Sequence, residues 1–333
     1  MSRPTLDDVA ALAGVSAKTV SNVLLKRPHV GEQTRVRVLE AVEEVGYRVN
    51  RAGRGLVSGR SGRVAIVVPN LYQPYFAETA ERLILALAEH NVTSTLRVAL
   101  DAGGERDALL ARTTADADGV IICPHFFAPE LIGSTALPRP VVQLGGAPTG
   151  LVDTVVMGEV EGFEAVTRHL LDTGRRRLAL VWNDFGNPEP RGSRYDGFVA
   201  AHRARGMEPD PALMVSGSDW DRRASGYEAV SGLLRNGRDF DAVVAFNDAL
   251  AVGALRALRS HGVRVPEDVA LSGFDDTDEA GFTVPPLTSV SPDHEWMAQT
   301  AVEMMMERLE GLDAPPRTRQ AGAHLVPRAS TQR

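Results

Sequence analysis

The sequence is poor in several residue types, and each shortage narrows what the 333-residue chain can be. Its single cysteine, Cys123, cannot form a disulfide within the chain, and the apolar neighbours in "GVIICP" favour a buried structural thiol. No run approaches the about 20 apolar residues of a membrane span. Acidic and polar residues also interrupt the first twenty positions, where a signal peptide needs an apolar core. We therefore predict a cytoplasmic protein without membrane contact.

The sequence also lacks the short motifs of common catalytic chemistries. It contains no G-x-S-x-G nucleophile elbow, no P-loop and no paired C-x-x-C motif. "HEWMA" at 294–298 lacks the second histidine of a zinc-protease helix. "DDTDE" at 275–279 is more typical of a solvated or capping turn than of a metal site. We predict a protein that is not an enzyme and that has neither a bound metal nor a cofactor.

The charge of the chain is unevenly distributed. The formal net charge is −7, yet residues 1–63 hold eleven Lys and Arg against six Asp and Glu, so the remainder is acidic. A basic head on an acidic body indicates that only the head meets a polyanion. The only two lysines, Lys18 and Lys26, lie in this head, and a general bias toward arginine is the simplest explanation of their scarcity.

Residues 5–24 have the pattern of two short helices joined by a glycine turn. In "TLDDVAALAG", Thr5 stands at the N-cap position, and Gly14 ends the apolar helical repeat. In "VSAKTVSNVLL", Ser16 caps a second helix whose inner face is formed by Val20, Val23 and Leu24. Two such helices form a helix-turn-helix unit.

A third helix is expected over 32–45. Its inward residues are predicted at three-residue spacing: Val36, Leu39, Val42 and Val45. The second helix would turn small or polar residues outward: Ala17, Lys18, Thr19, Ser21 and Asn22. A plain three-helix module that contacts another protein is the alternative. The positive charge and the small hydrogen-bonding face favour instead a helix that fits the DNA major groove, about 12 Å wide.

The segment "TLDDVAALAGVSAKTVSNVLLKRPHVGEQTRVRVLEAVEEVGYRVN" resembles the DNA-binding head of the lactose-repressor/galactose-repressor (LacI/GalR) family. It matches that family's pattern T-x-x-D-V-A-x-x-A-G-V-S-x-x-T-V-S almost throughout. The resemblance implies that the second helix enters the major groove and that Ala17, Lys18 and Asn22 read base edges. The further implied DNA contacts are Thr5, Ser16, Thr19 and Ser21.

Two positions of the head depart from the family pattern. Relatives commonly have arginine where this chain has Asn22, and an asparagine can bond adenine with two hydrogen bonds. Gly31 stands where the third helix usually has a Ser or Thr cap, a replacement that N-cap preferences tolerate.

Residues 50–63, "NRAGRGLVSGRSGR", by themselves suggest a flexible basic linker. The resemblance implies instead a hinge helix that folds on operator DNA, pairs with its twin in the minor groove and inserts a leucine, matched by Leu56. Asn50 and Arg54 are further implied DNA contacts. Gly53 and Gly55 replace the usual alanines at about 1 kcal/mol each, which predicts a hinge that is harder to order. The implied boundaries are 1–48 for the DNA-binding domain and 49–62 for the hinge.

From residue 64 onward, apolar strands alternate with amphipathic helices. The first series has strands in "RVAIVVPN", "VTSTLRVAL", "ADGVIICP" and "RPVVQLGG", with helices near 75–90 and 104–115. The second series begins after 158, with strands in "RRLALVW", "ALMVSG", "DAVVAFN" and "DVALSGFDD" and helices near 161–173, 194–205, 222–236 and 248–261. Such alternation predicts doubly wound parallel sheets, and two series predict two α/β lobes.

Polar residues stand where several predicted strands end, and ligands of such sheets bind at the carboxyl ends of strands. These residues are Asn70, Asn183, Asp184, Asn247, Asp248, Asp275 and Asp276. Each alone is more often a turn or cap residue. Together with Arg194 at a helix start, they indicate a site for a hydroxylated ligand.

The body resembles the same family's two-lobed, periplasmic-binding-protein-like effector domain, so the resemblance covers essentially the whole chain. Its motifs R-x-x-G-F, F-N-D-A-L-A-x-G and G-F-D-D imply effector contacts by Arg194, Asn247, Asp248 and Asp275. Further expected contacts are Asn70, Tyr75 and Phe76. Trp220 has two equally supported roles, stacking on a sugar face or packing beneath the cleft.

"PPLTSV" at 285–290 and "HLVPRAST" at 324–331 match the family's crossover and last strand. The implied lobes are 63–157 with 291–320, and 158–290 with 321–333. Gly158 stands where relatives often have an aspartate, so an expected acceptor for a sugar hydroxyl is missing.

The resemblance implies a transcription regulator, a repressor that binds a palindromic operator as a homodimer and responds to a sugar or polyol effector. The sequence does not choose whether the effector weakens or strengthens operator binding. Two alternatives stay open. A solute-binding protein or a sugar-processing enzyme would share the α/β body, with the helical head serving another partner.

Overall fold

The computed structural model describes residues 4–24, 29–47, 60–127, 130, 135–182, 192–217, 219 and 222–332. The chain divides into two compact units, Met1–Ser61 and Gly62–Arg333, which we call the head and the core. Most of the predicted hinge, 49–62, lies outside the described residues. Among the described residues, no helix is long and apolar enough to cross a membrane.

The head contains three helices, α1 (Leu6–Ala13), α2 (Ala17–Leu24) and α3 (Glu32–Val45). The Thr5 hydroxyl accepts from the backbone N–H of Asp8, and the Asp8 carboxylate accepts from the backbone N–H of Thr5 at 2.7 Å, which forms a capping box. Gly14 ends α1 in the left-handed region with φ of 64°. Ser16 accepts from the backbone N–H of Thr19 at 3.1 Å and begins α2 as predicted.

The predicted inner face of α3 is partly wrong. Val36 and Leu39 are 46% and 48% exposed, whereas Val38 and Ala41 are buried against α1 and α2. Successive steps of three residues turn a helix by about 300° each, so the four predicted positions spread over half of its circumference. Tertiary packing selects one side of that spread, and it keeps Val42 and Val45 while excluding the other two.

The first lobe of the core is a six-stranded parallel sheet in the order β11-β5-β4-β3-β1-β2. Its strands are β1 (Arg63–Val68), β2 (Thr93–Val98), β3 (Gly119–Ile122), β4 (Val141–Leu144), β5 (Asp153–Val156) and β11 (Thr318–Gln320). Its helices are α5 (Pro74–Glu89), α6 (Ala102–Leu109) and α13 (His294–Leu309). The predicted helix at 104–115 ends earlier, at Leu109, because Leu110 is its C-cap and Ala111 has a positive φ of 61°.

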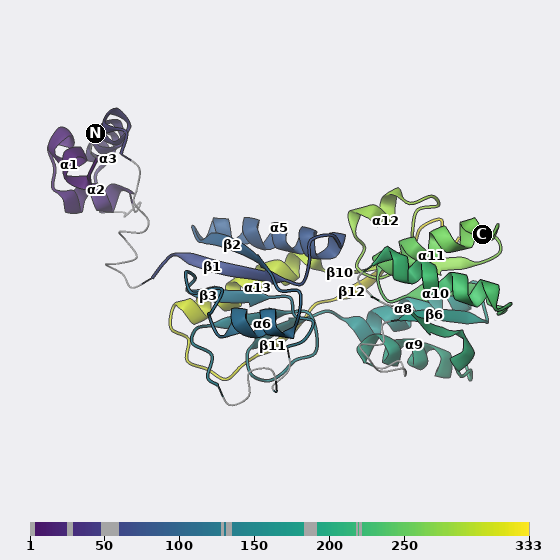
Figure 1. Cartoon of the computed structure of the whole chain (residues 1–333). Helices are drawn as coiled ribbons and strands as arrows, with labels where there is room; N and C mark the ends of the chain where they lie inside the picture. Colours follow the sequence, from purple (N-terminus) through teal and green to yellow (C-terminus); the bar gives the residue numbers. More distant parts are fainter. Residues whose placement is uncertain are drawn as a thin grey trace. The chain divides into compact units, whose positions relative to one another are not determined.

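Helices cover both faces of this sheet. Val64, Ile66 and Val68 of β1 pack with α5 and α13, whereas Ala65 and Val67 point to the opposite face and pack with α6. The apolar residues of β1 are continuous because both of its faces are buried. Figure 1 shows α5 and α6 on opposite sides of the strands.

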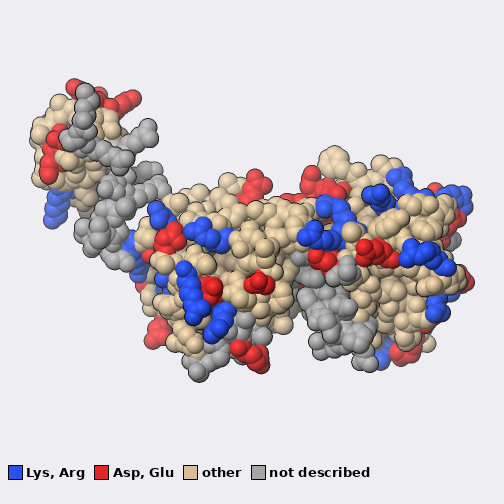
Figure 2. Space-filling view, viewed as in Figure 1, with Lys and Arg blue, Asp and Glu red and all other residues tan. Residues whose placement is uncertain are grey.

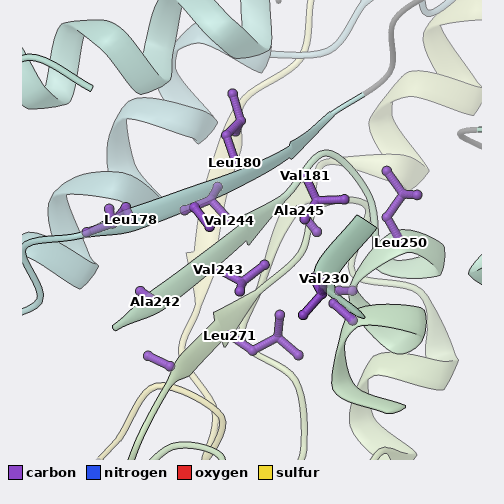
Figure 3. Packing of buried hydrophobic residues seen from close by; sticks show 14 of the residues in the cluster. Leu178, Leu180, Val181, Val230, Ala242, Val243, Val244, Ala245, Leu250 and Leu271 are labelled. Atoms are coloured by element: carbon purple, nitrogen blue, oxygen red, sulfur yellow. The ribbon is translucent and has the colours of Figure 1, made fainter. Parts of the chain in front are cut away.

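The second lobe is a four-stranded parallel sheet in the order β7-β6-β8-β9. Its strands are β6 (Leu178–Trp182), β7 (Met214–Ser216), β8 (Ala242–Ala245) and β9 (Ala270–Ser272). Its helices are α8 (Glu159–Asp172), α9 (Ser193–Arg203), α10 (Arg223–Arg235), α11 (Asp248–Ser260) and the short α12 (Asp278–Phe282). A short 3-10 turn, Pro211–Leu213, precedes β7. Figure 3 shows Val230 of α10 and Leu250 of α11 packed among apolar residues of β6, β8 and β9.

A third, two-stranded sheet joins the lobes. β10 (Ser289–Pro292) and β12 (Ala323–Val326) are antiparallel, with Val290 opposite Leu325. β10 leads from the second lobe to α13 of the first, and β12 returns from β11 to the second. Together with the passage from β5 to α8, these segments carry the chain between the lobes three times.

Candidate functional site

The first candidate site is the outer face of α2 in the head. Val20 and Val23 are buried, Lys18 is exposed, and Ala17, Ser21 and Asn22 are partly exposed. The Ser16 and Thr19 hydroxyls are hydrogen-bonded to each other at 2.9 Å. Both lie at the start of a helix, where backbone N–H groups favour an anion such as a phosphate. Asn50, Arg54 and Leu56 lie outside the described residues.

The second candidate site is a cavity of about 330 Å³ between the two lobes of the core. The first lobe and the passage to α8 supply Gln73, Tyr75, Phe76, Cys123, Pro124, His125, Phe127, Gln143, Leu144, Gly145, Gly146, Ala147 and Met157. The second lobe supplies Glu159, Gly192, Ser193, Arg194, Phe246 and Asp275. This is the volume and mixed lining expected of a small-molecule site.

Arg194, the second residue of α9, is the only cation among the described lining residues. Its Nε donates to the Glu159 carboxylate at 2.8 Å, and one terminal nitrogen donates to the carbonyl oxygen of Phe246. The other terminal nitrogen lies 3.9 Å from Asp275 Oδ1, and the guanidinium carbon lies 4.4 Å from the centre of the Phe274 ring. Burial lowers the pKa of Arg194, but the Glu159 and Asp275 charges outweigh that effect and raise it.

Glu159 is a cavity residue that the sequence reasoning missed. It is the first residue of α8, next to Gly158, and its second carboxylate oxygen accepts from the Ser193 hydroxyl at 2.5 Å. The carboxylate that Gly158 lacks is therefore present one position later. A side chain at 158 would meet Ala321 and Ala323 at 3.0–3.3 Å, so these neighbours would have to move slightly to admit it. The sequence signal that could have identified Glu159 is an acidic residue in the first turn of a helix that begins where the chain crosses from one lobe to the other.

Aromatic rings form the apolar wall of the cavity. The rings of Tyr75 and Phe76 meet edge to face with centres 5.1 Å apart, and Phe76 contacts the His125 ring at 5.4 Å. Burial raises the pKa of Tyr75 well above its usual value and lowers the pKa of His125 to about 4. Both side chains are therefore uncharged at neutral pH.

Asp275 lies at the cavity in an unusual backbone conformation. Its φ is +102° and that of Asp276 is +47°, a region that costs non-glycine residues energy and is enriched at functional sites. His294 Nε2 donates to the Asp275 carbonyl at 2.5 Å, and the Asp275 N–H donates to the carbonyl of Val290. Contacts from the crossover region therefore hold this strained turn in place.

Three predicted effector residues are buried near the cavity without lining it. Asn70 accepts from the backbone N–H of Gln73 at 3.1 Å, and Asn247 caps α11 by accepting from that of Leu250 at 2.8 Å. Asp248 accepts from the Ser289 hydroxyl and the Thr277 backbone N–H at 2.6 and 2.8 Å. Tyr75, Phe76, Arg194 and Asp275 do line the cavity. Asn183, Asp184 and Trp220 lie outside the described residues.

A buried carboxylate behind the cavity wall was also missed. Glu105 of α6 accepts from the backbone N–H of His125 at 2.6 Å and of Phe126 at 3.0 Å. Burial raises its pKa to about 7, although these hydrogen bonds act in the opposite direction. Glu105 thus anchors the segment after β3 that forms one side of the cavity. Its position in an otherwise ordinary polar helix gave no sequence signal.

Charged side chains of the two signs are mixed on the face of the core that Figure 2 shows, where Lys and Arg are interspersed with Asp and Glu. Ion pairs of the core include Arg112 with Asp107 and Arg264 with Asp268. Among the described residues, no group of three or more His, Cys, Asp and Glu side chains could hold a metal ion.

A helix-turn-helix head and a two-lobed parallel α/β core with an interlobe cavity define a DNA-binding regulator built on a periplasmic-binding-protein-like core. The family models agree with this class. Residues 5–50 match the lacI family of bacterial regulatory proteins, and residues 167–331 match a periplasmic binding protein-like domain.

Relatives match along nearly the whole chain. The HTH-type transcriptional regulator CelR of Thermobifida fusca is 34% identical, over 98% of both chains. The solved transcriptional regulator CelR-cellobiose complex is 32% identical over 98% of this chain and 100% of that one, with a TM-score of 0.69. The Lac repressor dimer bound to operator shares the fold, with a TM-score of 0.82 at 22% identity over 99% of both chains.

The chain belongs to the lacI family of bacterial regulatory proteins. It is a DNA-binding transcriptional regulator and not an enzyme. The resemblance seen in the sequence and the predicted fold class are both confirmed.

Proposed function

We propose that this regulator is a cytoplasmic repressor whose affinity for operator DNA is controlled by a sugar or related polyol bound between the lobes. The observation that carries the proposal is the composition of the interlobe cavity. Carboxylates, amide groups and the aromatic rings of Tyr75, Phe76 and Phe246 line it together. A sugar presents hydroxyl groups at its edges and apolar C–H faces, so it needs both kinds of wall.

Names of relatives support this class of ligand. The CelR structure is a complex with cellobiose, and a LacI family regulator from Enterococcus faecium was solved with bound ribose. We propose that Arg194, Glu159 and Asp275 provide the polar contacts of this chain. Asn70, Asn247 and Asp248 then make no contact with the ligand, and their role is to hold the backbone at the strand ends.

We propose that α2 reads the operator in the major groove through Ala17, Lys18 and Asn22. Thr19 and Ser21 would contact phosphate or bases, and Thr5 and Ser16 phosphate, which fixes the register of the helix on DNA. The small side chains allow the helix to approach the base edges closely. We assign the hinge contacts to Asn50, Arg54 and Leu56 on the sequence alone.

We propose a homodimer on a palindromic operator, because a twofold protein fits half-sites about one helical turn apart. Large apolar side chains are exposed on the core at Leu85, Leu100, Phe282 and Val284, with exposed fractions of 61%, 76%, 79% and 64%. We propose that a second copy covers part of this exposed apolar surface. A ligand that bridges the lobes of each copy would then shift the operator affinity, typically by about 1–3 kcal/mol.

The test is selection of bound fragments from a random DNA pool by the full-length protein at stated salt. We expect a palindromic sequence whose affinity changes when a neutral sugar binds the core. Release of the selected DNA by cellobiose, ribose or another neutral sugar supports the proposal. Purely salt-sensitive binding without sequence preference would overturn it, as would turnover of a bound sugar.

A further inference from the structure

We propose that the interlobe cavity selects an uncharged, hydroxyl-rich ligand and rejects phosphorylated or carboxylated ones, and that Glu159 sets this selectivity. The inference deepens the proposed function and rests on it, since it takes the cavity as the effector site. It follows from which polar atoms of the cavity are already engaged and which are not.

The cation that an anionic ligand would need is already engaged. All three nitrogens of Arg194 point to protein acceptors, namely the Glu159 carboxylate, the Phe246 carbonyl and, at 3.7 Å, the Met157 sulfur. Asp275 lies 3.9 Å from the same guanidinium. An incoming phosphate would have to displace Glu159, and that carboxylate also accepts from the Ser193 hydroxyl. Displacement would therefore break two charge-assisted hydrogen bonds.

The charge of the cavity also disfavours an anion. Its described lining holds two carboxylates, Glu159 and Asp275, against the one guanidinium of Arg194. His125 contributes no positive charge at neutral pH, because burial lowers its pKa to about 4. Charges interact strongly in a site that excludes water, so a phosphate would meet net repulsion.

Two acceptor oxygens of the described cavity lining are left without a protein donor. Among the described residues, the side-chain oxygens Gln73 Oε1 and Gln143 Oε1 are buried without a hydrogen-bond partner. Both residues line the cavity, and they are only 2% and 1% exposed. Gln143 already uses its Nε2 to donate to the carbonyls of Gly145 and Ala147.

A buried unpartnered acceptor is costly, and a ligand that donates hydrogen bonds would satisfy it. Hydroxyl groups are such donors. The dianionic phosphoryl group of a phosphate ester has only acceptor oxygens and would satisfy neither amide oxygen. The unpartnered acceptors and the net charge of the cavity thus favour the same kind of ligand, an uncharged one that carries hydroxyl groups.

The test uses inorganic phosphate as the anionic probe, with the full-length protein and isothermal titration calorimetry. The variants are Glu159→Gln, Glu159→Asp and the double variant Glu159→Gln with Arg194→Leu. Glu161→Gln is the matched control, because Glu161 is exposed on the same turn of α8 and does not line the cavity. Any phosphate that binds the basic head is common to all the proteins and cancels in the comparison.

We expect wild type, Glu159→Asp and Glu161→Gln to show only the common background. Glu159→Gln should gain phosphate affinity by about ten-fold, and the double variant should lose that gain. Saturable phosphate binding to wild type above the Glu161→Gln background would overturn the proposal, as would a folded Glu159→Gln protein without any gain. Thermal unfolding establishes that each variant is folded.

Selection of DNA with the same preparations separates the two proposals. If an operator is found and a neutral sugar releases it while Glu159→Gln gains no phosphate binding, only the selectivity proposal fails. If no operator is found, the proposed function fails independently of the phosphate result.

Discussion

Arg194 Nε and Glu159 Oε1 lie 2.8 Å apart, although the two residues are 35 positions apart in the sequence. The pair joins the starts of α8 and α9 at the edge of the interlobe cavity. Because both side chains are largely shielded from water, each depends on the other for neutralisation.

Replacement of Arg194 by leucine should destabilise the core. Glu159 and Asp275 would lose their shared counter-charge, and we expect a loss of about 1–3 kcal/mol in the free energy of unfolding. Urea denaturation at neutral pH and fixed protein concentration measures it. Arg168→Leu is the control, because Arg168 and Glu164 form a pair with half-exposed side chains that is worth about 0.5 kcal/mol. Equal losses in the two variants would contradict the assignment.

Asp153→Asn should weaken the first lobe more strongly. The Asp153 carboxylate is fully buried and accepts from the Arg308 Nε, the Arg317 side chain and the Arg317 backbone N–H, at 2.9, 3.2 and 2.8 Å. It thereby joins β5 to α13 and to the start of β11. We expect a loss of about 3 kcal/mol by urea denaturation. Asp172→Asn, at an exposed pair with Arg205, should cost far less.

Asp248 should make stability depend on pH. Burial raises its pKa from 3.8 to about 7, although hydrogen bonds from Ser289 and Thr277 lower it. The folded protein therefore binds this proton more tightly than the unfolded chain does. The resulting stabilisation is fully present below about pH 4 and is lost as the pH rises to about 7.

We expect Asp248→Asn to remove this component. The difference in unfolding free energy between wild type and variant should change between pH 4 and 7 by at most about 4 kcal/mol. Denaturation at several pH values measures that difference, and a constant difference would contradict the prediction. Glu105, whose pKa is also raised to about 7, remains in both proteins and cancels in the comparison.

Glu105→Gln should loosen the segment that lines the cavity after β3. A glutamine offers one oxygen where the carboxylate accepts from His125 and Phe126 with two. We expect the amide hydrogens of these two residues to exchange about ten-fold faster, and the exchange rates of other amides to change less. Asp107→Asn, on the same helix but at an exposed pair with Arg112, is the control. Unchanged exchange at both amides would exclude the anchoring role.

Asn22→Arg should change which bases the head prefers. Arginine bonds guanine where asparagine bonds adenine, so selection from a DNA pool should return a different base at one position of each half-site. The salt dependence of binding should change little, because a base contact is exchanged and no phosphate contact is removed. Gln33→Arg is the control for the added charge, because Gln33 is an exposed residue of α3. An unchanged base preference would contradict the reading role.

Local sequence signals predicted the head well. The N-cap at Thr5, the helix end at Gly14 and the cap at Ser16 each depend on residues within a few positions, and the structure confirms all three. The inner face of α3 was predicted only in part, because apolar spacing could not tell which half of the helix meets α1 and α2. Val36 and Leu39 are exposed for that reason.

The cavity was only partly predictable. Polar residues at strand ends pointed to the correct edge of each sheet, yet Asn247 and Asp248 turn their oxygens to backbone N–H groups of the protein itself. A polar residue at a strand end caps a helix or faces a ligand, and short sequence patterns do not distinguish the two uses. Glu159 and Glu105 went unnoticed because isolated glutamates in helices are ordinary surface residues.

The sequence by itself determined the class of this protein. Periodicity, caps and continuous apolar strands specify a helix-turn-helix head and two parallel α/β lobes, because these features depend on near neighbours. Tertiary structure alone decided the chemistry of the cavity. Side chains as distant as Gln73, Glu159 and Asp275 meet there because the lobes face each other across it. Whether each polar atom is already satisfied, and hence which ligand the cavity can accept, follows only from that packing.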